Sequence, residues 1–366
     1  MRSSFFSVCF DNIIFELQRA GGVSLYWAEL LLRHQSAYTK CFGRKNKNIF
    51  CNGLSFTFHD EVYPSFISRR YFPFLPRSVA APKGKHIFHS SYFRYSNDRN
   101  AINVTTVHDF TYEHFVRGPR LWVHSWQKRL AVKKSQGVIC VSENTKKDLL
   151  HFYPWVDPEV VKVVYNGVGE AFYPVDNAAS ALEKELGFCP DKPFLLFVGD
   201  RSAYKNFDAF VALASYFPEM DFVVVGGQPF TEAESQLLSP IQSRLHHFRG
   251  VSSEVLNLLY NTAYCFVYPS SYEGFGIPIL EAMKAGCPVV STNLSSIPEV
   301  AGDAALLVDQ PTAESLAIEI QKLADPDFRG ILLEKGFKQA EKFSWDKCFE
   351  ETYAFYQELW ERSDIK

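Results

Sequence analysis

Short apolar runs rich in Val, Ile and Phe alternate with longer helix-like segments along the whole chain. Apolar runs of about four to eight residues are typical of buried strands, and their alternation with helical segments is typical of βαβ units. This pattern predicts an α/β fold with parallel sheets. The expected strands span residues 5–10, 86–89, 103–107, 138–141 and 162–165, followed by 194–198, 222–225, 264–268, 288–291 and 305–308.

These strands form two sets, separated by the Gly- and Pro-containing stretch 166–193. With 366 residues, of which 47% are hydrophobic, the chain can build two domains of ordinary size with large cores. We therefore expect a first domain over 1–175 and a second over 176–344. The final segment, 345–366, has apolar residues at helical spacing, and the pattern alone leaves open on which domain this helix packs.

The net charge of −3 conceals a difference between the two halves of the chain. Residues 1–170 hold 23 Lys and Arg against 13 Asp and Glu, whereas residues 171–366 hold 15 against 28. Opposite charges indicate that the two halves meet different partners.

Cysteine usage and hydropathy bear on the compartment. The eight cysteines include no C-x-x-C pair, so the sequence predicts neither a zinc cluster nor a redox motif. Asp11 interrupts the first apolar stretch before the core of a signal peptide is complete, and no run approaches the roughly 18 apolar residues of a membrane span. We expect a cytoplasmic protein that is either soluble or peripheral at the inner face of the membrane.

The densest motif is SSYEGFGIPILEAMKAGCPVV, which follows an expected strand. Gly274 and Gly276 allow the backbone to approach a ligand closely, and Pro278 suits the first turn of a helix. Glu273 would then lie on the loop and Glu281 in the first helical turn, so that both carboxylates can face one ligand beside free amide groups. The alternative is that Glu281 only favours the helix dipole and Glu273 is an ordinary loop charge.

A second motif, FVGDRSAYKNFDAF, also follows a strand. The strand ends at Gly199, and Arg201 and Lys205 lie on a turn before a helix with Phe207 and Phe210 on its apolar face. Open α/β sheets bind ligands at the carboxyl ends of their strands. Because Arg offers a planar fork and Lys a compact charge, the two cations suit a diphosphate. The alternative is that both are solvated loop residues.

Two weaker signals lie in the first half of the chain, and two further patterns argue against other functions. Gly21–Gly22 precede an amphipathic helix, and His108 follows a strand, although a lone His is as often a structural group as a site residue. No G-x-G-x-x-G opens either set of strands, which argues against dehydrogenase chemistry. The D-x-D at Asp325–Asp327 follows a helical pattern and predicts a helix-ending turn, so no metal is expected.

These residues together resemble glycosyltransferase family 4, and the likeness covers essentially the whole chain. The stretch from Glu273 to Glu281 looks like the family's paired-glutamate motif, and GDRSAYKN resembles its phosphate-binding turn. Further matches are Gly21–Gly22, the VHD around His108, VSENTKKDL from Val141, YNGV from Tyr165 and IPEVAGDAALLVD from Ile297. The resemblance implies the GT-B fold, in which two Rossmann-like domains face each other across a cleft and a C-terminal helix crosses back to the first domain.

The resemblance also implies an activity: transfer of a hexose from a nucleotide diphosphate sugar, with retained configuration and no metal or cofactor. Arg201 and Lys205 would hold the diphosphate and stabilise its leaving charge. Glu281 would hold the ribose, Glu273 the donor sugar, and His108 would contact that sugar from the first domain. Attack on the same face would pass through an oxocarbenium-like state. Backbone groups of the donor site would come from Gly22, Gly199, Gly274, Phe275, Gly276 and Ile277.

The donor and the acceptor follow only in part. We expect UDP-glucose, slightly favoured over GDP-mannose, and a growing glycan or lipid-linked acceptor in polysaccharide assembly, with no nucleic acid partner. Two alternatives stay open, namely a GT-B epimerase or phosphorylase and a non-catalytic sugar-nucleotide-binding scaffold. Segment 62–97 holds six Lys and Arg, nine Phe and Tyr and no acid. It predicts either a surface for an anionic membrane or glycan lipid, or buried rings beneath an ordinary solvated face.

Overall fold

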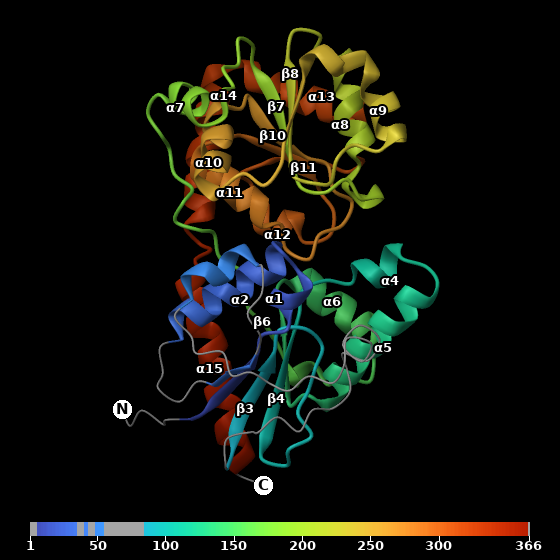
Figure 1. Ribbon diagram of the computed structural model, residues 1–366, viewed down its shortest axis with the longest axis vertical. Coiled ribbons are helices and arrows are strands. Elements are labelled where there is room, and N and C mark those ends of the chain that lie inside the picture. The colour runs from blue at the N-terminus through green and yellow to red at the C-terminus, as the bar shows by residue number, and fades with distance from the viewer. Residues whose placement is uncertain (1–5, 35–39, 43–47, 55–83, 365–366) are drawn as a thin grey trace. The chain divides into compact units, whose positions relative to one another are not determined.

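The computed structural model describes four stretches of the chain, namely residues 6–34, 40–42, 48–54 and 84–364. They belong to two compact units (Figure 1). The first unit contains the chain up to Asn166 and again from Trp345, and the second comprises Gly167–Ser344. Most of segment 62–97, including Arg69, Arg70 and Arg77, lies outside the described residues.

The first unit contains a parallel sheet in the order β2-β1-β3-β4-β5-β6. Its strands are β1 (Val8–Asp11), β2 (Lys40–Phe42), β3 (His86–Ser90), β4 (Ala101–Val107), β5 (Gly137–Cys140) and β6 (Val161–Val163). Its helices are α1 (Ile14–Leu17), α2 (Gly22–Arg33), α4 (Thr111–Phe115), α5 (Pro119–Lys134), α6 (Glu143–Phe152) and α15 (Trp345–Asp364). Every residue of β1, β3, β4 and β5 is buried, as expected for strands covered on both faces.

The second unit has a parallel sheet in the order β12-β11-β10-β7-β8-β9. Its strands are β7 (Phe194–Val198), β8 (Asp221–Val225), β9 (Leu245–Phe248), β10 (Cys265–Tyr268), β11 (Val289–Thr292) and β12 (Leu306–Val308). Its helices are α7 (Ala178–Leu186), α8 (Phe207–Ala212), α9 (Glu232–Leu238), α10 (Ser253–Thr262), α11 (Ile277–Ala285), α12 (Ile297–Ala301), α13 (Ala313–Gln321) and α14 (Pro326–Ala340). Counted from β7, this is the doubly wound strand order, which reverses between β7 and β10.

All ten expected strands are present, with ends that differ by a few residues. Two further strands, β2 and β9, were not predicted. Both are the outermost strands of their sheets. An edge strand has a neighbour on one side only, so it needs no continuous apolar run, and the residues of β9 are all only half-buried. The α/β fold with two parallel sheets is therefore confirmed.

The second unit begins at Gly167, earlier than the predicted domain limit at residue 175. Val168 forms a parallel bridge with Ser344, and the backbone N–H of Val175 donates to Asn261 Oδ1 at 2.7 Å. These contacts assign the first part of the predicted linker to the second unit.

The last helix, α15, returns to the first unit, as the resemblance implies. It packs beside α2 (Figure 1). Its Tyr356 hydroxyl is hydrogen-bonded to His89 on β3, and the Lys85 ammonium donates to the backbone carbonyl of Trp360 at 2.7 Å. Among the described helices, none combines the length and the apolar character that a bilayer crossing requires.

Candidate functional site

The predicted ligand residues of the second unit lie on two loops at the carboxyl ends of β7 and β10. The loop after β7 carries Gly199, Arg201 and Lys205, and the loop after β10 carries Glu273–Ile277. β7 and β10 are neighbours in the sheet, at the point where the strand order reverses. Because the connections leave such a point on opposite faces, a crevice opens there, and open α/β sheets bind ligands in it.

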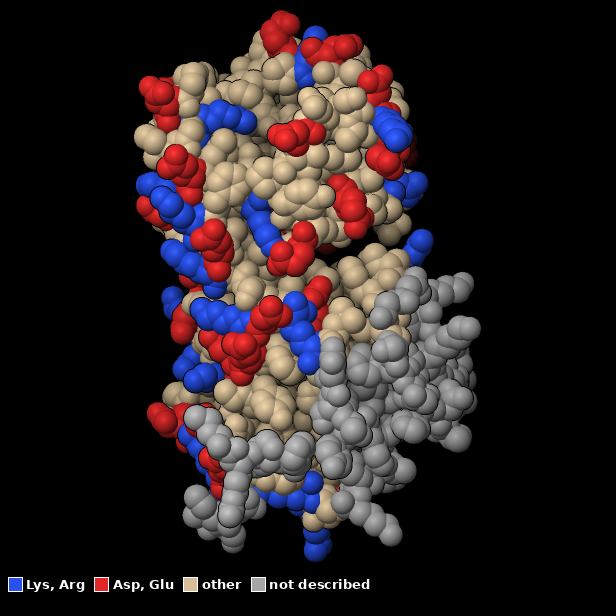
Figure 2. All heavy atoms as spheres, turned by 90° about the vertical axis from the view of Figure 1, so that its left-hand side faces the viewer, with Lys and Arg blue, Asp and Glu red and all other residues tan. Residues whose placement is uncertain are grey.

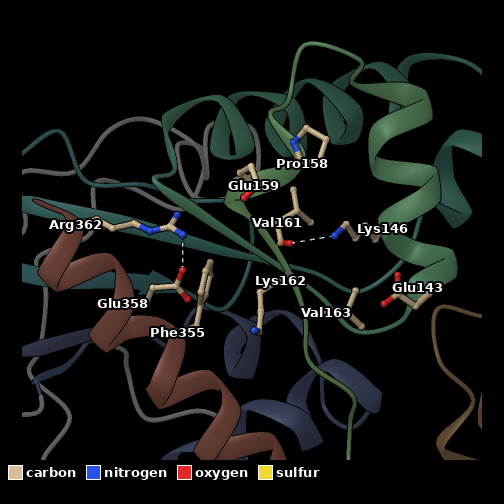
Figure 3. A pocket seen from close by; sticks show the side chains of 10 residues that line it. All are labelled: Glu143, Lys146, Pro158, Glu159, Val161, Lys162, Val163, Phe355, Glu358 and Arg362. Carbon is tan, nitrogen blue, oxygen red and sulfur yellow. Dashed lines mark hydrogen bonds and ion pairs between the residues drawn. The ribbon is translucent and has the colours of Figure 1, made fainter.

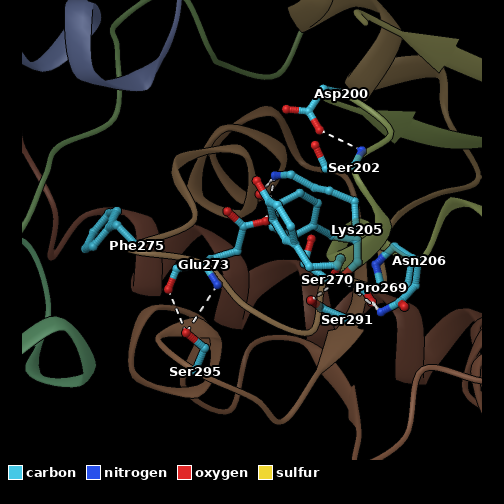
Figure 4. A network of polar contacts seen from close by, with 12 residues as sticks. Asp200, Ser202, Lys205, Asn206, Pro269, Ser270, Glu273, Phe275, Ser291 and Ser295 are labelled. Atoms are coloured by element: carbon cyan, nitrogen blue, oxygen red, sulfur yellow. Dashed lines mark hydrogen bonds and ion pairs between the residues drawn. The ribbon is translucent and has the colours of Figure 1, made fainter. Parts of the chain in front are cut away.

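Lys205 and Glu273 meet at this point (Figure 4). Lys205 Nζ lies 2.7 Å from Glu273 Oε1 and 3.1 Å from the Tyr268 hydroxyl, and both charged side chains are largely buried. Burial, the largest single influence, lowers the pKa of Lys205, but the charge and hydrogen bond of Glu273 together with Tyr204 and Asp200 outweigh it, so the pKa lies above its ordinary value. The ammonium is therefore charged at neutral pH, and an anion can compete with Glu273 for it.

Gly199 allows the backbone to pass close to this ammonium. Its φ is +134°, a conformation that residues with a side chain rarely adopt, and a Cβ there would lie 3.9 Å from Lys205 Nζ. A side chain at this position would enter the space beside the ammonium. The strand end thus leaves room for a ligand next to Lys205.

A row of hydroxyl groups holds the loop after β10. The side chains of Ser291 and Thr292 on β11 donate to the carbonyls of Tyr268 and Ser270, each at 2.6 Å. Further along, Ser295 Oγ donates to the Glu273 carbonyl at 2.6 Å, and Ser296 Oγ lies 2.9 Å from the carbonyls of Glu273 and Phe275. Because these donors come from the neighbouring strand and its loop, they fix the backbone on both sides of Glu273.

Asn206 joins the two loops. Its backbone is left-handed, with a φ of +49°, and its Nδ2 donates to the Pro269 carbonyl and to Ser271 Oγ, each at 2.7 Å. The Ser271 N–H in turn donates to the Tyr204 carbonyl at 2.7 Å. Lys205 and Glu273 therefore stand on a single hydrogen-bonded framework.

Arg201 has a different partner. Its Nε donates to Glu234 Oε1 at 2.6 Å, and its guanidinium lies 4.6 Å from the centre of the Phe230 ring. This hydrogen bond holds the pKa of Glu234 at about 2. Arg201 Nη1 is buried without a hydrogen-bond partner among the described residues. The alternative that Arg201 and Lys205 are solvated loop residues is therefore wrong.

The glycine-rich loop ends where α11 begins. Gly276 is the N-cap of α11, with a φ of +105°, and Pro278 lies in the first turn, as predicted. Phe275 is buried against the Phe343 ring, with centroids 5.8 Å apart, and Ile277 is buried as well. No side chain caps the first turn of α11, but Pro278 has no N–H and the Ile279 N–H donates to the Gly276 carbonyl at 3.0 Å, so less hydrogen-bonding capacity remains for a ligand than at an ordinary helix start.

The predicted position of Glu281 needs correction. It lies beyond the first turn of α11, which contains no acidic residue, and its carboxyl group is buried. The Tyr260 hydroxyl donates to Glu281 Oε2 at 3.3 Å. Burial raises the pKa of Glu281 to about 7. The helix dipole acts mainly on charges in the first turn, and Glu281 lies beyond it and loses hydration on burial. The alternative that Glu281 only favours the helix dipole is therefore wrong.

Gly22 and His108 belong to the first unit, whose sheet order also reverses, between β1 and β3. Gly22 is the first residue of α2, and a Cβ there would meet nothing within 4 Å. His108 follows β4, packs edge-on against Tyr26, and has a buried Nε2 without a partner among the described residues. Burial lowers the pKa of His108 to about 4, so its ring is neutral at pH 7 and offers a polar nitrogen.

A separate hollow of about 440 Å³ lies at the outer edge of β6 in the first unit (Figure 3). It is lined by three carboxylates and three cations, namely Glu143, Glu159, Glu358, Lys146, Lys162 and Arg362, and by none of the predicted site residues. Since its carboxylates and cations balance, it favours no ligand of one charge.

The described residues contain no group of three or more His, Cys, Asp and Glu side chains placed to hold a metal ion. The D-x-D was predicted to end a helix. It also begins one, because Asp325 is the N-cap of α14 and its Oδ1 accepts from the backbone N–H groups of Asp327 and Phe328. Asp325 is therefore committed to the helix start.

Sequence reasoning missed the residues that support the site. Gly226–Gly227 directly follow β8, and a Cβ on Gly227 would overlap Arg201 Nη1. A Gly-Gly pair was noticed before an amphipathic helix at Gly21–Gly22, and a second Gly-Gly pair was present here. Ser295 and Ser296 gave no such signal, since their role depends on which strands are neighbours.

Comparisons with known proteins identify the family of this chain. The family described as Glycosyl transferases group 1 matches residues 179–339, and Glycosyltransferase Family 4 matches residues 54–171. An O-antigen chain mannosyltransferase B from Escherichia coli is 47% identical over 110 residues, which are 30% of this chain and 29% of that protein. An alpha-maltose-1-phosphate synthase from Mycolicibacterium smegmatis is 31% identical over 258 residues, covering 65% of this chain and 67% of the synthase.

A solved structure agrees in fold over almost the full length. The sucrose-phosphate synthase from Thermosynechococcus elongatus aligns with a TM-score of 0.74 at 20% identity, covering 98% of this chain and all of that one. Against the two sequence relatives, the chain spans less than a third of the mannosyltransferase and about two thirds of the synthase. Because family models match both units and the architecture is shared, the chain belongs to glycosyltransferase family 4 and has the GT-B fold.

Proposed function

We propose that this protein transfers a hexose from a nucleotide diphosphate sugar to a glycan or lipid-linked acceptor in polysaccharide assembly, with retained configuration and without a metal ion. A hexosyl donor is supported by relatives named as a mannosyltransferase and a maltose-1-phosphate synthase. The observation that carries the proposal is the buried Lys205–Glu273 pair at the strand reversal of the second sheet.

The pair suggests how the donor is held. A diphosphate that enters the crevice would take the ammonium of Lys205 and the guanidinium of Arg201, whose buried Nη1 has no partner among the described residues, because both cations are strong partners for phosphate oxygens. Glu273 would then be free to accept hydrogen bonds from hydroxyl groups of the sugar. Because the loops are already fixed, the cations need no reorganisation when negative charge develops on the leaving diphosphate.

Two donors fit this chemistry. The sequence slightly favours UDP-glucose, and the stretch shared with the mannosyltransferase favours GDP-mannose as the second candidate. Both carry a diphosphate and a hexose, so the same contacts serve either. A thermal-shift screen separates them, because a ligand at a hundredfold its Kd stabilises the fold by roughly 2.7 kcal/mol.

The test of the site uses Lys205→Ala and Glu273→Ala. Each should lower kcat for transfer on the order of 100- to 1,000-fold, the usual cost of removing a group that stabilises transition-state charge. Lys192→Ala and Glu232→Ala, which change exposed residues of the same unit, are matched controls and should retain activity. Near-normal kcat/KM in both site variants would contradict the assignment.

The remaining alternatives differ in what they consume. An epimerase converts the donor without acceptor, a phosphorylase requires free phosphate, and a scaffold binds the donor without turnover. Incubation of the purified protein with each donor alone, with phosphate and with a glycan acceptor separates these cases. Transfer that persists in EDTA supports the metal-independent reaction, whereas full loss restored by Mn²⁺ or Mg²⁺ excludes it.

A further inference from the structure

Four large apolar side chains are exposed within a short stretch of the first unit. Phe115, at the end of α4, is 45% exposed, and Trp122, Val123 and Trp126 on α5 are 72%, 48% and 49% exposed. Trp126 is a neighbour of both Trp122 and Val123 on the helix surface, since it follows them by four and three positions. Single exposed apolar residues are common, but a cluster of this kind marks an interaction surface.

The same stretch lacks acidic residues. From residue 114 to residue 142 the sequence has six Lys and Arg and neither Asp nor Glu. Five of these cations are exposed, namely Arg117, Arg120, Arg129, Lys133 and Lys134. On the face of the protein seen in Figure 2, by contrast, acidic and basic side chains lie interspersed. The exposed side of α4–α5 is therefore both apolar and positively charged.

Helical spacing places exposed rings and cations of α5 on one side of the helix. Trp122, Trp126, Arg129 and Lys133 follow one another at steps of four, three and four residues, so they form one stripe along α5. The rings occupy its first half and the cations its second half. We call the exposed side chains from Phe115 to Lys134 the α4–α5 surface.

Contacts on the opposite side of α5 fix its rotation. Lys128 is fully buried, and its Nζ lies 2.7 Å from Glu113 Oε2 and 2.8 Å from the Asp109 carbonyl. The buried His124 ring stacks on Tyr112, with centroids 3.8 Å apart. Breaking a buried ion pair is costly, so α5 cannot turn its rings inward. The stripe is a permanent feature of the folded unit.

We propose that the α4–α5 surface docks this protein on a membrane that contains anionic lipid. Trp side chains prefer the boundary between headgroups and acyl chains, and Lys and Arg beside them attract anionic headgroups. A helix with rings and cations on one exposed face and a fixed inner face suits a flat interface. This surface concerns where the protein acts, and it does not rest on the proposed transfer reaction.

Other occupants fit the surface less well. A neutral glycan needs acceptors for its hydroxyl groups, and the exposed side chains named above provide cationic donors, indole N–H donors and hydrocarbon but no acceptor. Single-stranded nucleic acid also stacks on aromatic rings beside cations, so the oligonucleotide arm of the experiment below distinguishes it from a membrane. The α4–α5 surface is not the segment 62–97 for which the sequence predicted a membrane surface.

The experiment is co-sedimentation of the full chain with vesicles of phosphatidylcholine, with and without phosphatidylglycerol. The wild type should bind the anionic vesicles at least about tenfold better, and added salt should weaken this binding. Trp122→Ala with Trp126→Ala should abolish most of it. Arg120→Glu with Arg129→Glu and Lys133→Glu should weaken it on the order of 100-fold.

Matched changes elsewhere test the location. Tyr216→Ala and Lys338→Glu alter exposed residues of the second unit and should leave vesicle binding unchanged. Trp122→Phe with Trp126→Phe keeps the rings and should retain most binding, which separates lost contact from lost folding. Wild-type binding in the alanine and charge variants, or no binding to anionic vesicles at low salt, overturns the proposal. Variant-sensitive binding of a single-stranded oligonucleotide or a soluble glycan, without vesicle binding, assigns the surface to that partner instead.

Discussion

At the scale of single residues, the two glutamates of the paired motif differ in their surroundings. Glu273 meets an ammonium at 2.7 Å, whereas Glu281 has the Tyr260 hydroxyl at 3.3 Å. The sequence shows their spacing but not their surroundings, and this is why both were expected to be accessible carboxylates. In the folded chain Glu281 is close to its point of ionisation at neutral pH.

The raised pKa of Glu281 predicts a dependence of stability on pH. Its folded-state pKa of about 7 exceeds the ordinary glutamate value of 4.5, so between these pH values the folded state holds a proton that the unfolded chain has lost. This contribution to the free energy of unfolding is fully present below about pH 4.5 and is lost as the pH rises through about 7. Glu281→Gln should therefore be more stable than the wild type at about pH 8, on the order of 3 kcal/mol.

Urea unfolding at mildly acidic and mildly basic pH measures this difference. Glu341→Gln, at an exposed position of the same unit, is the control and should follow the wild type at every pH. If Glu281→Gln and the wild type lost stability in parallel as the pH rose, Glu281 would not be the group that titrates. A ligand that donates hydrogen bonds to the carboxylate should lower its pKa and reduce the difference.

At the scale of elements, the central strands could be predicted from the sequence, but two of the edge strands and the side chains that hold the site loops could not. Continuous apolar runs such as Phe194–Val198 identify a central parallel strand directly, because both of its faces are covered. The half-buried edge strand Leu245–Phe248 has no such run. The contacts of Ser295 and Ser296 follow from the pairing of β10 with β11, and pairing between strands is not visible in a local pattern. The motifs could thus be found, but not the framework that holds them.

The turn after β8 provides a test of that framework. Gly227 has a φ of +69°, and a Cβ there would overlap Arg201 Nη1. Gly227→Ala should push the guanidinium away from its place, and we expect the affinity for a nucleoside diphosphate to fall on the order of tenfold. Binding of the bare nucleoside should change much less. Isothermal titration with UDP and GDP, each compared with its nucleoside, measures both effects.

Gly187→Ala is the matched control for this change. Gly187 has a φ of +63°, and a Cβ there would meet nothing within 4 Å. Both variants carry the same cost of a left-handed alanine, about 1 to 2 kcal/mol, but only Gly227→Ala disturbs Arg201. Equal loss of diphosphate affinity in the two variants would show that the backbone, and not the guanidinium, is responsible.

At the scale of the whole molecule, the chain enters the second unit at Gly167 and returns to the first at Trp345. The first unit therefore depends on a helix that the chain adds last. Buried residues of α15, among them Phe355, Tyr356 and Leu359, pack on its sheet. All six tryptophans, at positions 27, 122, 126, 155, 345 and 360, belong to this unit as well. Tryptophan fluorescence consequently reports the unfolding of the first unit alone.

Gly137, the first residue of β5, tests how tightly α15 is packed. A Cβ there would overlap Leu359 Cδ1 and lie 2.8 Å from Phe355 Cε1, and both side chains are buried. Gly137→Ala should therefore destabilise the first unit by about 1 to 3 kcal/mol through overpacking. Guanidinium unfolding followed by fluorescence should show an earlier midpoint, while far-UV circular dichroism should retain a second transition that has not moved. Gly330→Ala, in open space on α14, should leave the fluorescence midpoint unchanged and stabilise the second unit by about 0.5 to 1 kcal/mol. An unchanged midpoint in Gly137→Ala would contradict the close packing of α15, and a joint shift of both signals would show that the two units unfold as one.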